Sequence, residues 1–181
     1  MNQFGEFVPL GFSAVEAGID RVARKLNMPG ELRQDVILMR LVTCMARHYE
    51  ELIGRVIRPQ RLNPVMFKTL LMTFGSPANE VNPSRLSDVT GESRANMTRI
   101  CDELCERGLI VRKASESDRR RVVVSLTAAG ERLVRKMLPR IGKPLQAAHA
   151  LPGAQEKREI ERLLKKQLAG LESVLDEGTS R

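Results

Sequence analysis

The sequence is poor in aromatic residues and has no tryptophan. Aromatic residues make up 3% of its 181 positions, with one tyrosine and five phenylalanines. A hydrophobic core must therefore be aliphatic, supplemented by the eight methionines, and such a composition favours helices. The chain is long enough to bury this core as one domain or two small ones.

Cysteine is scarce, and no segment is long and apolar enough to span a bilayer. Three cysteines at uneven spacing do not form a disulfide framework, which favours a reduced environment. The N-terminus lacks the basic and apolar regions of a signal peptide. We therefore expect a cytoplasmic protein with no membrane partner.

The common catalytic and metal-binding motifs are absent too. The sequence has no HExxH, no CxxC pair, no glycine-rich phosphate loop and no G-x-S-x-G. Its two histidines, His48 and His149, are each interpreted as helix-surface residues. We therefore expect no catalysis, no cofactor and no metal.

Positive charge is plentiful: 30 Lys and Arg face 22 Asp and Glu, a net charge of +8. This suits an anionic partner such as nucleic acid or a membrane surface. The excess is spread out, since residues 84–121 carry nine basic against seven acidic residues. The placement of single arginines is therefore more informative than the total.

The most informative stretch is Ser93–Arg112, SRANMTRICDELCERGLIVR. Apolar residues recur in it at i, i+3, i+4 and i+7, the spacing of one buried helix face. Ser93 is the predicted N-cap of this helix, and Gly108 is predicted to end it with a left-handed backbone conformation. The buried face consists of Met97, Ile100, Cys101 and Leu104.

The outer face of this helix carries residue types that read DNA. Arginine binds guanine, asparagine binds adenine, and threonine reaches a phosphate or a thymine methyl group. A solvated helix face has a similar composition, so the helix alone does not decide between the two interpretations. The candidate DNA-binding residues are Ser93, Arg94, Asn96, Thr98 and Arg99.

The neighbouring segments favour the DNA interpretation. Asn63-Pro64 and Asn82-Pro83 each combine a cap residue with proline at the first helical position. The second of these helices, with Leu86 and Val89 expected to face inward, is joined to the Ser93 helix by Thr90-Gly91. Two short helices joined by a tight turn are typical of a helix-turn-helix.

A β-hairpin is predicted next, because the β-branched segments 109–113 and 121–126 flank the turn ASESDRR. A hairpin after a helix-turn-helix makes a winged helix, and an arginine at its tip can enter a minor groove. A solvated turn is the alternative. The tip residues are Asp118, Arg119, Arg120 and Arg121.

The ends of the chain are predicted to form helices with more apolar surface than one subunit buries. The middle of Glu31–Ile57 is apolar almost all round, and the last helix carries a coiled-coil-like stripe. Thr127 is expected to cap a helix that is interrupted or kinked near Pro139 and Pro144. A short helix over Ser13–Leu26 is expected to face inward through Val15, Ile19, Val22 and Leu26. The stripe of the last helix is Ile160, Leu163, Leu164, Leu168, Leu171, Val174 and Leu175.

These elements predict a mainly α fold with a small β-hairpin wing (α+β). The expected parts are an N-terminal extension over 1–30, a helical dimerisation region over 31–62 and 127–176, and a winged helix-turn-helix DNA-binding domain over 63–126. A homodimer is expected, because a second copy is the simplest cover for the apolar ends. A helical scaffold protein with a basic surface is the alternative of a different class, but it would not need the arginine-tipped hairpin.

An effector site is predicted on the long helix, which places Arg40, Cys44 and Arg47 on one face. A cationic, partly apolar strip suits a lipophilic carboxylate or phenolate. Alternatively, Arg47 pairs with Glu50 or Glu51 and Cys44 is a small core residue. The residues of the next helix that are expected to line the opposite side of this effector site are Met66, Phe67 and Leu70.

Redox sensing is a further alternative, because Cys101 and Cys105 are four residues apart on the Ser93 helix. An intrahelical disulfide would distort that helix, since the two Cα atoms lie near the upper limit for bridging. Cys101 also belongs to the buried stripe and is expected to be inert.

Taken together, these residues resemble the MarR family of winged-helix regulators. The family's wing signature D-x-R-x5-L-T-x2-G occurs here, and the Ser93 helix is similar to the family's recognition helix. The similarity is strongest to the EmrR branch, which represses multidrug-efflux operons. The signature residues are Asp118, Arg120, Leu126, Thr127 and Gly130.

The resemblance implies a homodimeric repressor that binds a pseudo-palindromic operator in double-stranded DNA and places its wings in the flanking minor grooves. It implies that small aromatic or lipophilic anions bind between the dimerisation helices and the recognition helix and release the DNA. It also implies that Asp118 is structural and that one wing arginine contacts DNA, although three successive arginines leave open which one. The smallest members lack an equivalent of residues 1–30.

Overall fold

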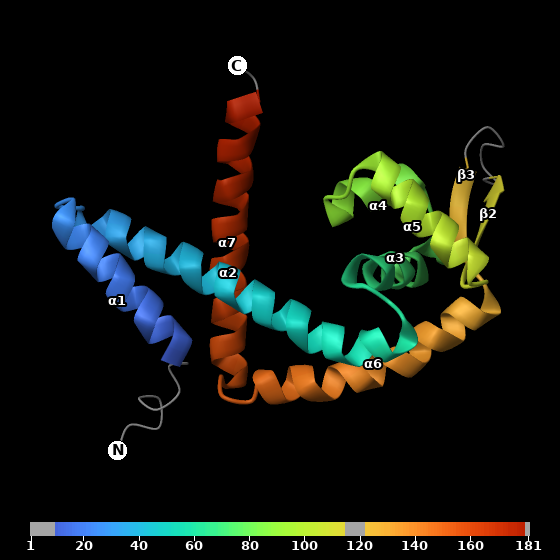
Figure 1. Cartoon of the computed structure of the whole chain (residues 1–181), viewed down its shortest axis with the longest axis horizontal. Helices are drawn as coiled ribbons and strands as arrows, with labels where there is room; N and C mark the ends of the chain where they lie inside the picture. Colours follow the sequence, from blue (N-terminus) through green and yellow to red (C-terminus); the bar gives the residue numbers. More distant parts are fainter. Residues whose placement is uncertain (1–9, 115–121, 180–181) are drawn as a thin grey trace.

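The computed structural model describes residues 10–114 and 122–179. These residues form long and short helices with a small antiparallel sheet at one edge of the molecule, beside α5 (Figure 1), which confirms the predicted fold class. The helices are α1 (Leu10–Lys25), α2 (Gly30–Ile57), α3 (Pro64–Gly75), α4 (Pro83–Thr90), α5 (Arg94–Glu106), α6 (Ala128–Ala148) and α7 (Ala154–Thr179). Two 3-10 turns, η1 (Arg58–Gln60) and η2 (Pro77–Asn79), and three strands, β1 (Glu80–Val81), β2 (Ile110–Ala114) and β3 (Val122–Leu126), complete the chain.

The helix starts follow the predicted caps. The side chains of Asn63, Asn82, Ser93 and Thr127 each accept a hydrogen bond from a backbone N–H in the first turn of the following helix. The left-handed backbone needed after α4 and α5 is supplied by Gly91 and Gly108, with φ of 73° and 64°. Local side-chain chemistry thus fixes both ends of the helix-turn-helix.

The sheet has the strand order β1-β3-β2. The predicted hairpin is present, with Ile110 opposite Leu126 and Ala114 opposite Val122. The unpredicted strand β1 pairs Val81 with Val124 on the other edge of β3. A strand of two residues carries no alternation pattern, so it has no signal in the sequence.

An aliphatic core fills the space between α3, α4, α5, the sheet and α6. The predicted stripe of α5 is confirmed, because Met97, Ile100, Cys101 and Leu104 are at most 2% exposed. The core continues beyond 63–126, to Ile57 at the end of α2 and to three residues of α6. Val89, expected to face inward, is 63% exposed, because α4 is short and turns only Leu86 and Ser87 inward.

Helix α1 lies against α2 (Figure 1), and of the residues expected to face inward Val15 and Ile19 are half-buried. It begins at Leu10 rather than Ser13, and it buries Phe12 and Ala23. Val22 and Leu26 are exposed, so their predicted inward position is wrong. An ion pair between Arg33 and Asp20 at 2.5 Å joins the two helices near their connecting turn.

Helix α6 runs without interruption through Pro139 and Pro144, so the predicted interruption is absent, and the helix bends along its length (Figure 1). At its end His149 is not a simple surface residue. Its ring stacks on Tyr49 of α2 with centroids 5.5 Å apart, and its Nε2 lies 2.9 Å from the Tyr49 hydroxyl. This contact attaches the α6–α7 turn to α2.

Helix α7 crosses α2 and extends away from the other elements (Figure 1). All of residues 154–178 are exposed, including the apolar stripe. Over the described ranges, no helix combines the length and apolar character that a membrane span requires.

Candidate nucleic-acid interface

The predicted DNA-reading residues are spread over the solvent-accessible part of the N-terminal half of α5. Arg94, Thr98 and Arg99 are exposed, while Asn96 is half-buried. Arg94 forms no side-chain hydrogen bond or ion pair with any other described residue. Its guanidinium, at the first position of the helix, is therefore available to a partner.

Asn96 and Arg99 are held together by hydrogen bonds. The Asn96 amide donates to Glu92 Oε2 at 2.5 Å, and Asn96 Oδ1 accepts from Arg99 Nη2 at 2.8 Å. To bind the edge of a base, Asn96 must exchange these bonds for bonds to DNA. The two side chains consequently form one hydrogen-bonded unit.

The hydroxyl groups of Ser93 and Thr98 already have hydrogen-bond partners within the helix. Ser93 Oγ accepts from the backbone N–H of Asn96 at 3.2 Å, and Thr98 Oγ1 donates to the carbonyl oxygen of Arg94 at 2.9 Å. Both bonds lie within the first turns of α5. Ser93 and Thr98 thus shape the helix on which Arg94 stands.

The C-terminal end of α5 is anchored by Arg107 to the turn that follows α2. Its guanidinium donates to the carbonyl oxygens of Arg61 and Gln60 at 2.7 and 2.8 Å. Arg61 has the left-handed φ of 53° that directs its carbonyl there. Sequence reasoning missed this residue, since its partners lie 46 and 47 positions away.

The same corner is anchored to α6 by the L-T-x2-G part of the wing signature. The Thr127 hydroxyl donates to the carbonyl oxygen of Gly108 at 2.6 Å while capping α6. A Cβ atom on Gly130 would lie 2.0 Å from the carbonyl oxygen of Leu109, so only glycine fits there. These signature residues therefore position α5 rather than contact a ligand.

Arg112 of β2 reinforces the other flank of α5. Its guanidinium donates to Asp102 at 2.5 Å and to the carbonyl oxygen of Thr98 at 3.2 Å. Partial burial is the largest single influence and lowers the pKa of Arg112, but the hydrogen bond to Asp102 and the Coulombic attraction of Asp102, Cys101 and Cys105 together outweigh it, so the pKa is raised. The predicted wing residues Asp118, Arg119, Arg120 and Arg121 lie outside the described residues.

The predicted effector residues separate into two groups. Arg40, Cys44 and Arg47 line a cavity of about 340 Å³ between α1 and α2. Arg47 does not pair with Glu51, whose carboxylate binds Arg55 and Arg58 and has a lowered pKa for that reason. The wall of the cavity is completed by Gly11, Phe12, Val15, Thr43 and His48.

Met66, Phe67 and Leu70 do not face this cavity. They are 2%, 5% and 0% exposed within the core of the winged helix. The expectation that they line the same site as Arg40 is wrong, because α3 turns this apolar face toward the sheet and α5. The three predicted residues of α2 thus share one cavity, whereas the three predicted residues of α3 lie in the core.

The cysteines offer little to a redox sensor. Burial raises the pKa of the Cys101 thiol, whereas a sensor needs an accessible thiolate. Cys105 is half-buried, and Cys44, Cys101 and Cys105 are all free thiols.

Comparisons with known proteins decide the family. A MarR family model matches residues 69–121. The transcriptional repressor MprA of Escherichia coli is 32% identical over 145 residues, covering 80% of this chain and 82% of the relative. The chain belongs to the MarR family.

Solved structures of this family share the fold. A mutant of MarR from Escherichia coli, solved in complex with operator DNA, aligns with a TM-score of 0.65 and 26% identity over 75% of this chain and 96% of that one. CouR from Rhodococcus jostii RHA1, solved with p-coumaroyl-CoA, aligns with a TM-score of 0.64 over 69% of this chain and 87% of that one. At 22% identity the likeness to CouR shows the fold alone. This MarR-family chain therefore has the winged helix of transcriptional regulators, in agreement with the sequence resemblance.

Proposed function

We propose that the chain is a homodimeric repressor that binds a pseudo-palindromic operator and is released by a small aromatic or lipophilic anion. The observation that carries the proposal is the exposed surface of α5, where Arg94, unpaired among the described residues, lies on a helix that is capped by Ser93 and anchored at its C-terminal end by Arg107 and Thr127. The operator complex of the related MarR protein supports a DNA partner.

Within this proposal α5 enters the major groove. Recognition helices of this class contact base edges through their N-terminal residues. Arg94 has the free guanidinium to bind guanine O6 and N7, while Asn96 and Arg99 bind as a pair. Ser93 contributes a phosphate contact through its free hydroxyl hydrogen, and Thr98 contributes one when its hydroxyl exchanges the Arg94 carbonyl oxygen for a phosphate. One of Arg119, Arg120 and Arg121 enters the minor groove beside a structural Asp118.

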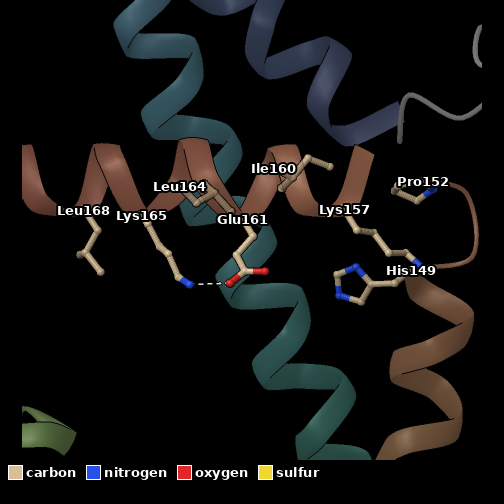
Figure 2. A pocket seen from close by; sticks show the side chains of 8 residues that line it. All are labelled: His149, Pro152, Lys157, Ile160, Glu161, Leu164, Lys165 and Leu168. Atoms are coloured by element: carbon tan, nitrogen blue, oxygen red, sulfur yellow. Dashed lines mark hydrogen bonds and ion pairs between the residues drawn. The ribbon is translucent and has the colours of Figure 1, made fainter. Parts of the chain in front are cut away.

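A second copy is the proposed cover of α2 and α7. Figure 2 shows Ile160, Leu164 and Leu168 along the start of α7, beside an ion pair between Lys165 and Glu161 at 2.5 Å. These residues line a groove of about 450 Å³ along the first half of α7. A larger groove of about 720 Å³ lies between α7 and exposed residues of α2. Contiguous apolar surface of this kind marks an interaction site. We assign 31–62 and 127–176 to dimerisation, 63–126 to DNA binding, and 1–30 to a separate extension.

DNA binding measured against salt tests the function. The wild type is expected to prefer one promoter fragment over random DNA, with an affinity that falls steeply with ionic strength as phosphate contacts are screened. Half-sites should lie about one helical turn, ~34–36 Å, apart. Equal affinity for every promoter fragment and for random DNA would contradict the proposal.

A further inference from the structure

The cavity between α1 and α2 has an unbalanced charge. Arg40 and Arg47 line it, and no acidic residue among those the structure describes does so. Neither arginine makes an ion pair with any other residue of the described ranges. Their neighbours on the same helix are paired, since Arg33 binds Asp20 and Arg55 binds Glu51.

The two arginines are seven residues apart, which places their backbones about 10 Å from one another along the helix. Both belong to the side of α2 that faces α1. Between them lie Cys44 and Thr43, and Phe12 and Val15 of α1 form the opposite wall. The cavity therefore has a positive group toward each end and a largely apolar middle.

We propose that this cavity binds an elongated dianion, a dicarboxylate with an apolar centre, with one carboxylate on Arg40 and the other on Arg47. Planar guanidinium groups hold carboxylates through charge-assisted, often bidentate hydrogen bonds. A volume of about 340 Å³ accommodates one small organic molecule. The apolar centre packs on Phe12, so α1 becomes part of the site.

This placement differs from the one that the family resemblance implies, between the dimerisation helices and the recognition helix. Here the N-terminal helix supplies one wall and the winged helix supplies none. The binding site stands by itself, whereas its regulatory consequence, release of DNA, rests on the proposed function. Ligand binding and DNA release are therefore measured separately.

The test is calorimetry of the full chain without DNA. The probes are suberate, 1,4-phenylenediacetate and 4,4′-biphenyldicarboxylate, each with its monoamide and its diamide. We expect at least one diacid to bind, its monoamide to bind about tenfold or more weakly, and the diamide weaker still, as charged hydrogen bonds are lost.

Arg40→Gln and Arg47→Gln are each expected to reduce the affinity for the diacid to that of the monoamide. Arg55→Gln, an exposed arginine of the same helix outside the cavity, is the matched control and should bind the diacid normally. Phe12→Trp supplies the only tryptophan of the chain, and its fluorescence should change on binding. A Phe74→Trp variant, in which the tryptophan lies outside the cavity, should show no change.

Three results would overturn the proposal: no binding of any diacid at millimolar concentration, a monoamide that binds as well as its diacid, or normal binding by both arginine variants. A diacid that binds as expected yet leaves operator affinity unchanged would support the site and remove effector release from the proposed function. An anion that releases DNA from wild type and from Arg40→Gln/Arg47→Gln alike would leave the proposed function intact and remove this cavity as the site through which DNA is released.

Discussion

Helices α5 and α7 carry the same kind of apolar stripe, but the stripe of α5 is buried and that of α7 is exposed. In α5 the four stripe residues are at most 2% exposed, whereas in α7 the stripe from Ile160 to Leu175 is 42% to 66% exposed. Helical periodicity reports that a face is apolar. It does not report whether the cover comes from the same subunit or from another.

Truncating a stripe residue of α5 is expected to have the largest effect, a loss of stability of the winged helix. Leu104→Ala should lower the free energy of unfolding by about 2–5 kcal/mol, because it leaves a cavity in a packed core. Denaturant titration measures the loss. The same truncation at Leu168 of α7 should leave the stability of the winged helix near the wild-type value. A loss as large at Leu168 would place α7 in the core of its own subunit.

Acidic residues introduced into the α7 stripe should weaken the proposed dimer. Leu164→Glu combined with Leu171→Glu is expected to convert a dimer into monomers, since two carboxylates would be buried without partners. Sedimentation velocity measures the state, and circular dichroism confirms that the helices persist. Operator affinity should fall because the two half-sites are then bound independently. A variant that remains dimeric would refute the role proposed for α7.

The contact of α6 with the end of α5 can be tested with two glycines of one helix. Gly130→Ala should destabilise the protein by about 1–3 kcal/mol through overpacking against Leu109. Gly142 has open space where its Cβ would be, so Gly142→Ala should be neutral or stabilising by up to about 1 kcal/mol. Thermal unfolding distinguishes them, and equal effects would contradict the structural account of the signature glycine.

A smaller effect is expected at Cys101. Because burial raises the pKa of its thiol, alkylation in the folded protein near neutral pH should be slower at Cys101 than at Cys44, which is less buried. The rate should rise as the pH increases toward that raised pKa. Mass spectrometry of modified peptides measures this order, and faster modification of Cys101 would revive the redox alternative.

The sequence predicted what depends on neighbouring residues. The helix caps at Asn63, Asn82, Ser93 and Thr127, the left-handed Gly108 and the tight turn at Thr90-Gly91 are local, and the structure has each of them. The buried face of α5 followed from its period. On this basis the winged helix could be expected before its tertiary contacts were known.

What the sequence did not predict depends on contacts between distant segments. The bonds from Arg107 to Gln60 and Arg61 and the pairing of β1 with β3 need the fold before they can be seen. The inward face of α1 was predicted in part, with Val15 and Ile19 half-buried but Val22 and Leu26 exposed, because a short helix with scattered apolar residues allows several registers. Met66, Phe67 and Leu70 were assigned to a pocket because an apolar face does not reveal which neighbour it meets.

The most direct test of the central claim is the base preference of Arg94→Ala on an operator selected from random DNA. If α5 reads bases through this residue, affinity for the selected operator should fall by about 1–3 kcal/mol, and the preference at one base pair of each half-site should relax. Arg140→Ala, an exposed arginine of α6, is the control and should leave that preference intact. A loss of affinity that is uniform over all sequences would make Arg94 a phosphate contact, and no loss at all would contradict the assignment of α5 as the DNA reader.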